Sequence, residues 1–274
     1  MTGRLSPLRS LGGILLLALA GALLLPWQIE LQRVGKAAGF RSIPMNLSLR
    51  AQIGQSGFLA ALSGFRAPLA AFLWIEAHLA WEKTEWGRMA GLFDTVTTLQ
   101  PHTLLYWDMA AWHMAWNASV AALQDTKQQS EALRERSSRQ YIALGRDFLE
   151  RGIQNNPDKY LLYESLGRLA RDKEQDHAAA ADNFARAASF PDAPRYLKRF
   201  AAYEAAQTPG RERDAYVRLL ALYREDQGMH TPALLSHLRE LEEKLRIPSD
   251  QRVTAQGVTP ALTNSPSPLP PPSR

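Results

Sequence analysis

The spacing of two prolines places the strongest constraint on how this chain can fold. Pro157 and Pro191 stand 34 residues apart, and Asn156 immediately precedes the first of them. The residue before a proline is disfavoured in a helical conformation, so one helix is expected to end here. Self-similarity at a period of about 20 to 50 residues is typical of arrays built from one repeated unit. The spacing therefore predicts a repeat architecture.

The residues between the two prolines follow the pattern of a helical hairpin. A large residue and a Leu-Gly pair are followed by a small-large-small series: Tyr163, Leu166, Gly167, Ala180, Phe184 and Ala187. Small residues at a helix crossing let the two axes approach closely, while large ones fill the space beside them. The interval resembles one unit of the tetratricopeptide repeat family, with the second-helix residues one position later than in the family pattern. This resemblance implies an α-solenoid of antiparallel helix pairs.

Less regular copies of the same order flank this interval. Residues 104–111 parallel residues 160–167, and the remaining matches are Gly145, Leu149, Gly152, Leu197, Phe200 and Ala201. The resemblance covers about residues 86–226. Helix signals run through the whole body of the chain, with almost no two-residue alternation. The predicted fold is therefore all-α, with helices near 66–83, 86–98, 102–121, 127–155 with a break, 159–172, 176–189, 194–206, 211–226 and 231–246.

The N-terminus carries an uncharged run from Ser10 to Ile29. At about 1.5 Å per helical residue these 20 residues span roughly 30 Å, the thickness of a bilayer core. We expect an uncleaved anchor, because Leu23 to Leu25 continue the apolar run beyond the small-x-small sequence Ala18 to Ala20, where a signal peptide could be cut. The short N-terminal tail favours a single-pass bacterial inner-membrane protein whose body is periplasmic.

Charge and composition exclude several classes of function. Residues 1–75 hold seven basic side chains against Glu30 alone, whereas the remainder holds 25 basic and 26 acidic residues. A basic quarter beside a neutral body indicates a membrane surface rather than nucleic acid. The absence of cysteine excludes disulfides, thiolate nucleophiles and iron–sulfur ligation.

Catalytic and metal-binding patterns are absent from the sequence. It contains no HExxH, no P-loop, no Gly-x-Ser-x-Gly and no dinucleotide-binding fingerprint, so we predict neither an enzyme nor a cofactor. The candidate metal ligands in this region are Glu76, His78, Glu82 and His113. Only His78 and Glu82 share a helical face at i, i+4, which favours a surface pair over a metal site.

Six of the seven tryptophans fall between residues 74 and 116. Helical spacing of Trp74 with Trp81, and of Trp112 with Trp116, favours packing in a core, and an aromatic cleft for a glycan or lipid is the alternative. Residues 49–85 resemble the N-terminal module of membrane-anchored bacterial repeat proteins of unassigned role. If one ring lines a groove, Trp112 is the best candidate.

These observations divide the chain into four parts. Residues 1–30 are the predicted anchor, 31–85 a juxtamembrane linker with a Trp-rich helical module, 86–247 the repeat domain, and 248–274 a proline-rich disordered tail.

The family resemblance implies a partner-binding groove on the first helix of each pair. The groove is predicted to include Asp108, Trp112, Trp116, Glu164, Arg168 and Arg171. Arg168 and Arg171 could hold a carboxylate of a partner's tail, and an ordinary solvated helix face is the alternative. The predicted function is a membrane-anchored scaffold that binds other envelope proteins, and a glycan- or lipid-binding module is the alternative. Expected partners are the bilayer, through residues 10–29, and one or more envelope proteins or peptides.

Overall fold

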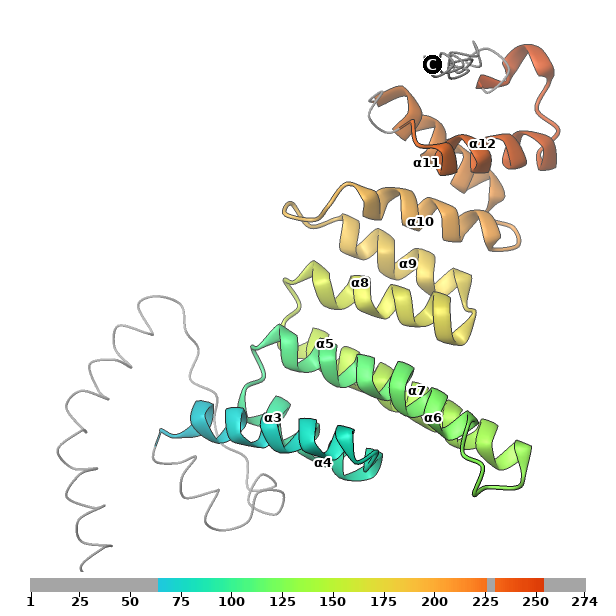
Figure 1. Ribbon diagram of the computed structural model, residues 1–274. Helices are drawn as coiled ribbons and strands as arrows, with labels where there is room; N and C mark the ends of the chain where they lie inside the picture. Colours follow the sequence, from blue (N-terminus) through green and yellow to red (C-terminus); the bar gives the residue numbers. More distant parts are fainter. Residues whose placement is uncertain (1–63, 226–229, 254–274) are drawn as a thin grey trace, which may run out of the picture. The chain divides into compact units, whose positions relative to one another are not determined.

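The computed structural model describes residues 64–225 and 230–253 (Figure 1). Every regular element in these two ranges is a helix, which confirms the all-α prediction. The predicted anchor at residues 10–29 and the tail from residue 254 lie outside the described residues. Within the described ranges, none of the helices combines the length and apolar character that crossing a membrane requires.

The chain forms two compact units that meet between Asn156 and Pro157. The first unit contains α3 (Arg66–Glu82), α4 (Trp86–Leu99), α5 (Leu104–Trp112), the π-helical segment η1 (His113–Ala118), α6 (Ser119–Leu123) and α7 (Glu131–Asn155). The second contains α8 (Tyr160–Leu169), the π-helical segment η2 (Ala170–Glu174), α9 (His177–Ala188), α10 (Tyr196–Gln207), α11 (Glu212–Glu225), α12 (Pro232–Lys244) and the 3-10 turn η4 (Ser249–Gln251).

Local sequence sets several of these helix boundaries. The Thr231 hydroxyl accepts a hydrogen bond from the Leu234 amide at 3.2 Å, and Pro232 occupies the first turn of α12. The Asp176 carboxylate caps α9 in the same way by accepting from the Ala179 amide at 2.9 Å. The predicted break within residues 127–155 is wrong from residue 131 onward, because α7 is continuous. No glycine or proline interrupts its first half, which is rich in good helix formers.

Two hairpins build the first unit. Helices α3 and α4 pack together, and α5, η1 and α6 pack along α7. Gly145 of α7 makes the second contact possible, since a Cβ there would lie 2.7 Å from Ala115 Cβ and 2.9 Å from the Ala111 carbonyl oxygen. The largest fully buried side chains of this unit are Phe93, Phe148, Met89, Leu99, Met114 and Leu149.

Successive helices pack side by side in the second unit, in the order α8, α9, α10, α11 and α12 (Figure 1). A Cβ on Gly167 of α8 would lie 2.9 Å from ring atoms of Phe184 in α9, so the glycine is needed where these helices cross. This is the crossing predicted from the Leu-Gly and Ala-x3-Phe patterns. Leu162, Leu169, Leu197, Leu219, Leu234 and Leu238 are buried in this unit.

Residues 104–111 and 160–167 share features of local structure. Both helices continue into a π-helical segment, at His113 and at Ala170. The Trp107 indole donates to the Pro101 carbonyl at 2.8 Å, and the Tyr163 hydroxyl donates to the Pro157 carbonyl at 3.5 Å. In each unit the contact joins a proline carbonyl to the side chain six positions later, so the two contacts are equivalent.

The second helix of each hairpin adds a further equivalent contact. The Arg151 guanidinium of α7 lies 5.5 Å from the Trp107 ring centre, and the Arg186 guanidinium of α9 lies 5.6 Å from that of Tyr163. Each arginine therefore covers the aromatic ring that anchors its hairpin. The α5–α7 and α8–α9 hairpins therefore share these two kinds of contact.

Candidate functional site

An exposed apolar stripe runs along α5, η1 and α6 of the first unit. Its exposed members are Leu105, Trp112, Val120 and Leu123, with exposed fractions of 58%, 44%, 39% and 46%. Trp116 is half-buried within the same row. The four exposed residues follow one another at intervals of seven, eight and three residues, which keeps their side chains close to one side of the helical stretch. We refer to these five residues as the α5–α6 stripe.

Trp112 is held in place by a buried histidine beside it. The rings of Trp112 and His113 meet edge to face with centroids 4.9 Å apart, and the Trp81 ring on α3 lies 5.9 Å from that of His113. Burial lowers the pKa of His113 to about 4, with a smaller contribution from the nearby His78. Asn117 Nδ2 lies 3.0 Å from His113 Nδ1, a contact that suits a neutral imidazole accepting a hydrogen bond. The exposed Trp112 ring therefore packs against a buried, neutral histidine.

The other described tryptophans divide between core and surface. Trp107 is buried, and Trp74 packs against Phe93 and Tyr106 with ring centroids 5.3 Å and 4.9 Å apart. These two rings serve packing, as the helical spacing of Trp74 favours. Trp112 is exposed, which differs from the core packing that its i, i+4 spacing with Trp116 favours.

Asp108 lies on α5 between two members of the stripe. It is half-buried and follows Leu105 by three residues, so its carboxyl stands on the side of α5 that carries the exposed leucine. The structure therefore brings Asp108, Trp112 and Trp116 to one helical stretch of the first unit. Sequence reasoning missed Leu105, Val120 and Leu123, although their helical spacing from Trp112 and Trp116 is a signal that could have identified them.

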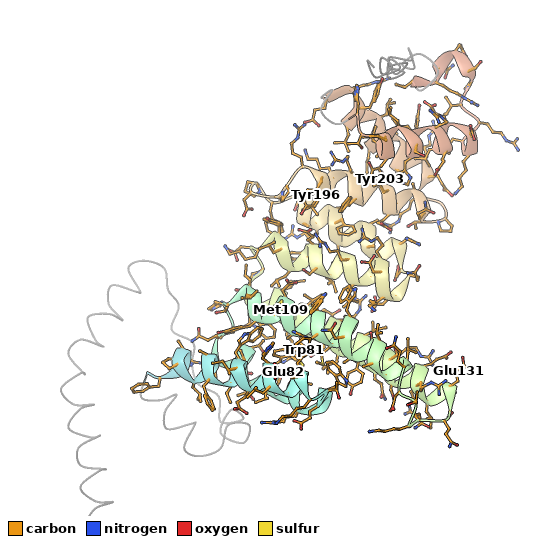
Figure 2. The ribbon with its side chains drawn as sticks, viewed as in Figure 1. Trp81, Glu82, Met109, Glu131, Tyr196 and Tyr203 are labelled. Atoms are coloured by element: carbon orange, nitrogen blue, oxygen red, sulfur yellow. The ribbon has the colours of Figure 1, made fainter. Side chains whose placement is uncertain are left out.

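In the second unit, Glu164 is buried and serves the fold. Its carboxylate accepts a hydrogen bond from the Tyr196 hydroxyl at 2.9 Å and pairs with Arg168 one helical turn away. Figure 2 labels Tyr196 at the beginning of α10, so this carboxylate ties α8 to α10. Desolvation, followed by the hydrogen bond to Glu164, raises the pKa of Tyr196.

Arg171 has a different carboxylate partner. Its Nε donates to Asp172 Oδ1 at 2.6 Å, and its guanidinium lies 5.7 Å and 5.8 Å from the ring centres of Phe184 and Phe200. The hydrogen bond to Asp172 raises the pKa of Arg171. Arg168 and Arg171 are thus each paired with a carboxylate of their own helical stretch.

Other candidates from the sequence have structural positions. His78 Nε2 lies 3.6 Å from Glu82 Oε1 in an exposed pair on α3. Among residues 64–225 and 230–253, no group of three or more acidic, histidine or cysteine side chains has the arrangement of a metal site.

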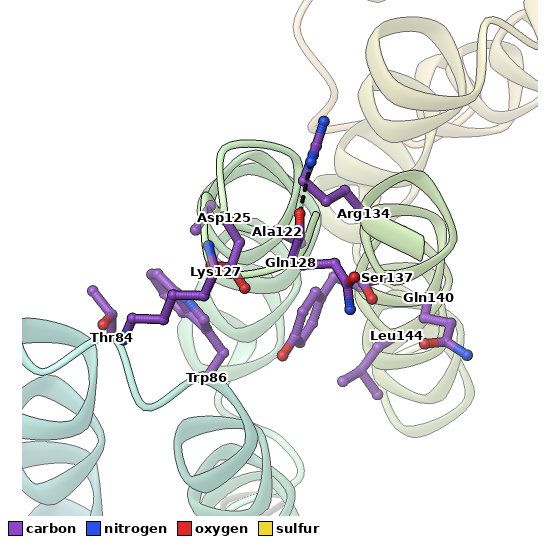
Figure 3. A pocket seen from close by; sticks show the side chains of 12 residues that line it. Thr84, Trp86, Ala122, Asp125, Lys127, Gln128, Arg134, Ser137, Gln140 and Leu144 are labelled. Atoms are coloured by element: carbon purple, nitrogen blue, oxygen red, sulfur yellow. Dashed lines mark hydrogen bonds between the residues drawn. The ribbon is translucent and has the colours of Figure 1, made fainter. Parts of the chain in front are cut away.

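A pocket of about 650 Å³ in the first unit was missed by sequence reasoning (Figure 3). It lies between the beginning of α4, helix α6, the loop at residues 124–130 and the first half of α7. Its lining includes Trp86, Lys127, Arg134 and Tyr141. No sequence motif joins these residues, because the reversal of the chain between α6 and α7 brings them together.

Comparisons with known proteins give this chain no family: no family model, no curated protein and no solved structure matches it.

Proposed function

We propose that this chain is a scaffold of the bacterial envelope that binds a helix of another protein through the α5–α6 stripe. The observation that supports this proposal is the row of exposed apolar side chains on a helical stretch that is otherwise well packed. Contiguous apolar surface on a folded protein marks an interaction site, and tryptophan is enriched among the residues that contribute most to binding. Trp112, fixed by His113, is the central anchor.

The length and chemistry of the stripe indicate the partner. Residues 105 to 123 span roughly 27 Å at about 1.5 Å per residue, which matches five turns of an opposing helix. Apolar groups line its length, with the Asp108 carboxyl near one end. The partner segment is therefore an amphipathic helix that presents leucine-like side chains at i, i+3 or i+4.

Membrane anchoring and the tetratricopeptide-like architecture belong to the same proposal. The uncharged run at residues 10–29 holds the body at the inner membrane on its periplasmic side. The hairpin repeated in both units supports a repeat architecture. Recognition of a protein partner, without catalysis or a cofactor, is the role proposed.

Photo-crosslinking in living cells tests the stripe directly. A photoreactive phenylalanine analogue replaces Trp112 or Leu123 in the full chain, and a third variant carries it at Arg139, an exposed position of α7 outside the stripe. We expect one discrete adduct from the two stripe positions and none from position 139. Adding Val120→Asp should abolish the adduct, because a charge in the row opposes apolar contact.

Equal labelling at all three positions, or an adduct that persists with Val120→Asp, would show that the stripe does not select a partner. The adduct is identified by mass spectrometry of the crosslinked peptide, which also reports whether the partner segment has helical apolar spacing.

A further inference from the structure

The pocket between α4, α6 and α7 has the dimensions and lining of a small-ligand site. Its volume of about 650 Å³ falls within the range of roughly 300 to 1,000 Å³ typical of ligand pockets. It is open to solvent on one side, and all of its walls belong to the first unit. In Figure 3, Lys127 extends from the loop toward Thr84 and Trp86, and Ser137, Gln140 and Leu144 follow one another along α7.

Two aromatic rings contribute the flat apolar surface of the pocket. Trp86 begins α4, and Tyr141 lies on α7, where burial raises the pKa of its phenol. Tyr141 therefore stays neutral and donates or accepts hydrogen bonds at ordinary pH. Indole and phenol rings offer flat faces on which the C–H face of a pyranose ring can pack, with polar groups at the ring edge.

Two cationic side chains, Lys127 and Arg134, and one carboxylate line the pocket. Arg134 Nη1 donates to the Gln128 carbonyl at 2.7 Å, which fixes the guanidinium while leaving its other N–H groups for a ligand. Lys127 and Arg134 form no ion pair within the described ranges. The one carboxylate in the lining, Asp125, already accepts from the Lys127 amide at 3.0 Å. A ligand with an acidic group would complete this arrangement.

Amide and hydroxyl groups complete the lining. Gln128 Oε1 accepts a hydrogen bond from the Ser130 amide at 3.2 Å, and the NH2 group of the same side chain is a hydrogen-bond donor. Ser137 and Gln140 add groups that both donate and accept. This mixture suits a ligand with many hydroxyl oxygens better than an apolar one, because an acyl chain would leave these polar groups unpaired.

We propose that this pocket binds an oligosaccharide that carries carboxylates, with Trp86 and Tyr141 against the sugar rings and with Lys127 and Arg134 each against a carboxylate. The site lies apart from the α5–α6 stripe in its residues and does not depend on the proposed scaffold function.

Isothermal titration calorimetry of the full chain with trigalacturonate tests this proposal. The full chain is kept in solution with a detergent that has a polyoxyethylene headgroup, because a sugar headgroup would compete for the pocket. We expect saturable binding of trigalacturonate, and affinities at least about tenfold weaker for a neutral galactose trisaccharide and for triglutamate. Absence of saturable heat, or equal affinity for either comparison ligand, would overturn the proposal.

Matched variants assign the binding to this pocket. Trp86→Ala should weaken trigalacturonate binding about tenfold or more, and Lys127→Gln and Arg134→Gln about threefold to tenfold each. Controls are Arg136→Gln, exposed two positions from Arg134 on α7, and Lys159→Gln in the second unit, which should both stay within about twofold of wild type.

Two further results separate this site from the stripe and from misfolding. Trp112→Ala should leave trigalacturonate binding unchanged while removing the crosslinked partner adduct. Lys127 lies on an exposed loop, so Lys127→Gln should retain the wild-type circular dichroism spectrum and melting temperature. Wild-type affinity in both Lys127→Gln and Arg134→Gln would place the saccharide elsewhere and overturn the assignment.

Discussion

At the scale of a single residue, burial is the main cause of the change in the chemistry of His113. In the sequence it stands among four residues considered as metal ligands, but in the fold it lies between Trp81, Phe93 and Trp112. An imidazole in apolar surroundings loses the hydration that stabilises its protonated form, so its pKa falls to about 4. His113 is thus a neutral support for Trp112.

His113 should therefore make the folded protein less stable as the pH decreases. The unfolded chain binds more protons than the folded chain between pH 6.5 and about 4, so the free energy of unfolding decreases as pH falls through this window. From the two pKa values we expect a loss of roughly 2 kcal/mol between pH 7 and pH 5.

Chemical denaturation at both pH values checks this expectation. His113→Gln should remove most of the difference, whereas His78→Gln, at an exposed position, should keep most of it, because His78 makes only the smaller contribution to the lowered pKa of His113. An identical pH dependence in wild type and His113→Gln would contradict the burial argument.

Gly145 is a second residue whose identity is determined by its neighbours, which leave no space for a Cβ. Gly145→Ala would press a methyl group against Ala115 and the Ala111 carbonyl, and we expect it to destabilise the protein by about 1 to 3 kcal/mol. Gly91→Ala is the matched control, because nothing lies within 4 Å of a Cβ there. It should stabilise α4 by about 0.5 to 1 kcal/mol through helix propensity. Thermal melting of both variants measures the contrast, and equal shifts would contradict a close crossing at Gly145.

At the scale of elements, the Glu164 carboxylate contacts side chains of two helices of its own unit. Its buried carboxylate joins Arg168 of α8 to Tyr196 of α10. Reversing the charge of Arg168 would place a second carboxylate against it. Loss of a partner in such a variant would therefore report unfolding as readily as a damaged binding face.

Arg168→Glu should accordingly lower the free energy of unfolding by roughly 1 to 3 kcal/mol, less than for a fully buried pair because Arg168 is half-exposed. Arg239→Glu, at an exposed position of α12, should stay within about 0.5 kcal/mol of wild type. Placing Glu164→Gln in the Arg168→Glu background should recover part of the loss, because the repulsion disappears. No recovery in urea denaturation would rule out a direct pair.

At the scale of the whole molecule, the division into two units follows the Asn156-Pro157 step. The Asn156 side chain donates to the Pro101 carbonyl at 2.8 Å and so joins the end of α7 to the chain just before α5. The predicted groove residues fall on both sides of this division, three in each unit. The interaction proposed for Trp112 and Trp116 therefore belongs to the first unit.

The proposed anchor predicts how the whole protein fractionates. Full-length protein should sediment with membranes and resist extraction by high salt, because an uncharged, largely apolar run of 20 residues is held by the bilayer and not by surface charge. A variant that lacks residues 1–30 should remain in the supernatant with a strongly helical circular dichroism spectrum. Membrane retention of the shortened protein would contradict the assignment of anchoring to residues 10–29.

Much of the fold could be predicted from local patterns. Proline positions, helix caps and the small-large series located the helices of residues 66–246 to within a few residues, and related the α5–α7 hairpin to the α8–α9 hairpin. The exception was the continuous α7, where a long polar stretch gave no packing signal. The candidate site was harder to predict from the sequence. Trp112 was among the predicted groove residues, whereas Val120, Leu123 and the pocket residues were not.

The sequence by itself determined the helical class, the hairpin period and the two glycines at helix crossings, because each depends on residues close along the chain or on the space that one residue needs. Only the tertiary structure decided which of these side chains are exposed. Glu164 became a buried link between helices, and Lys127 and Arg134 came to line a pocket with Trp86. Partners distant in sequence determine the charge and burial of a side chain, and therefore what it can bind.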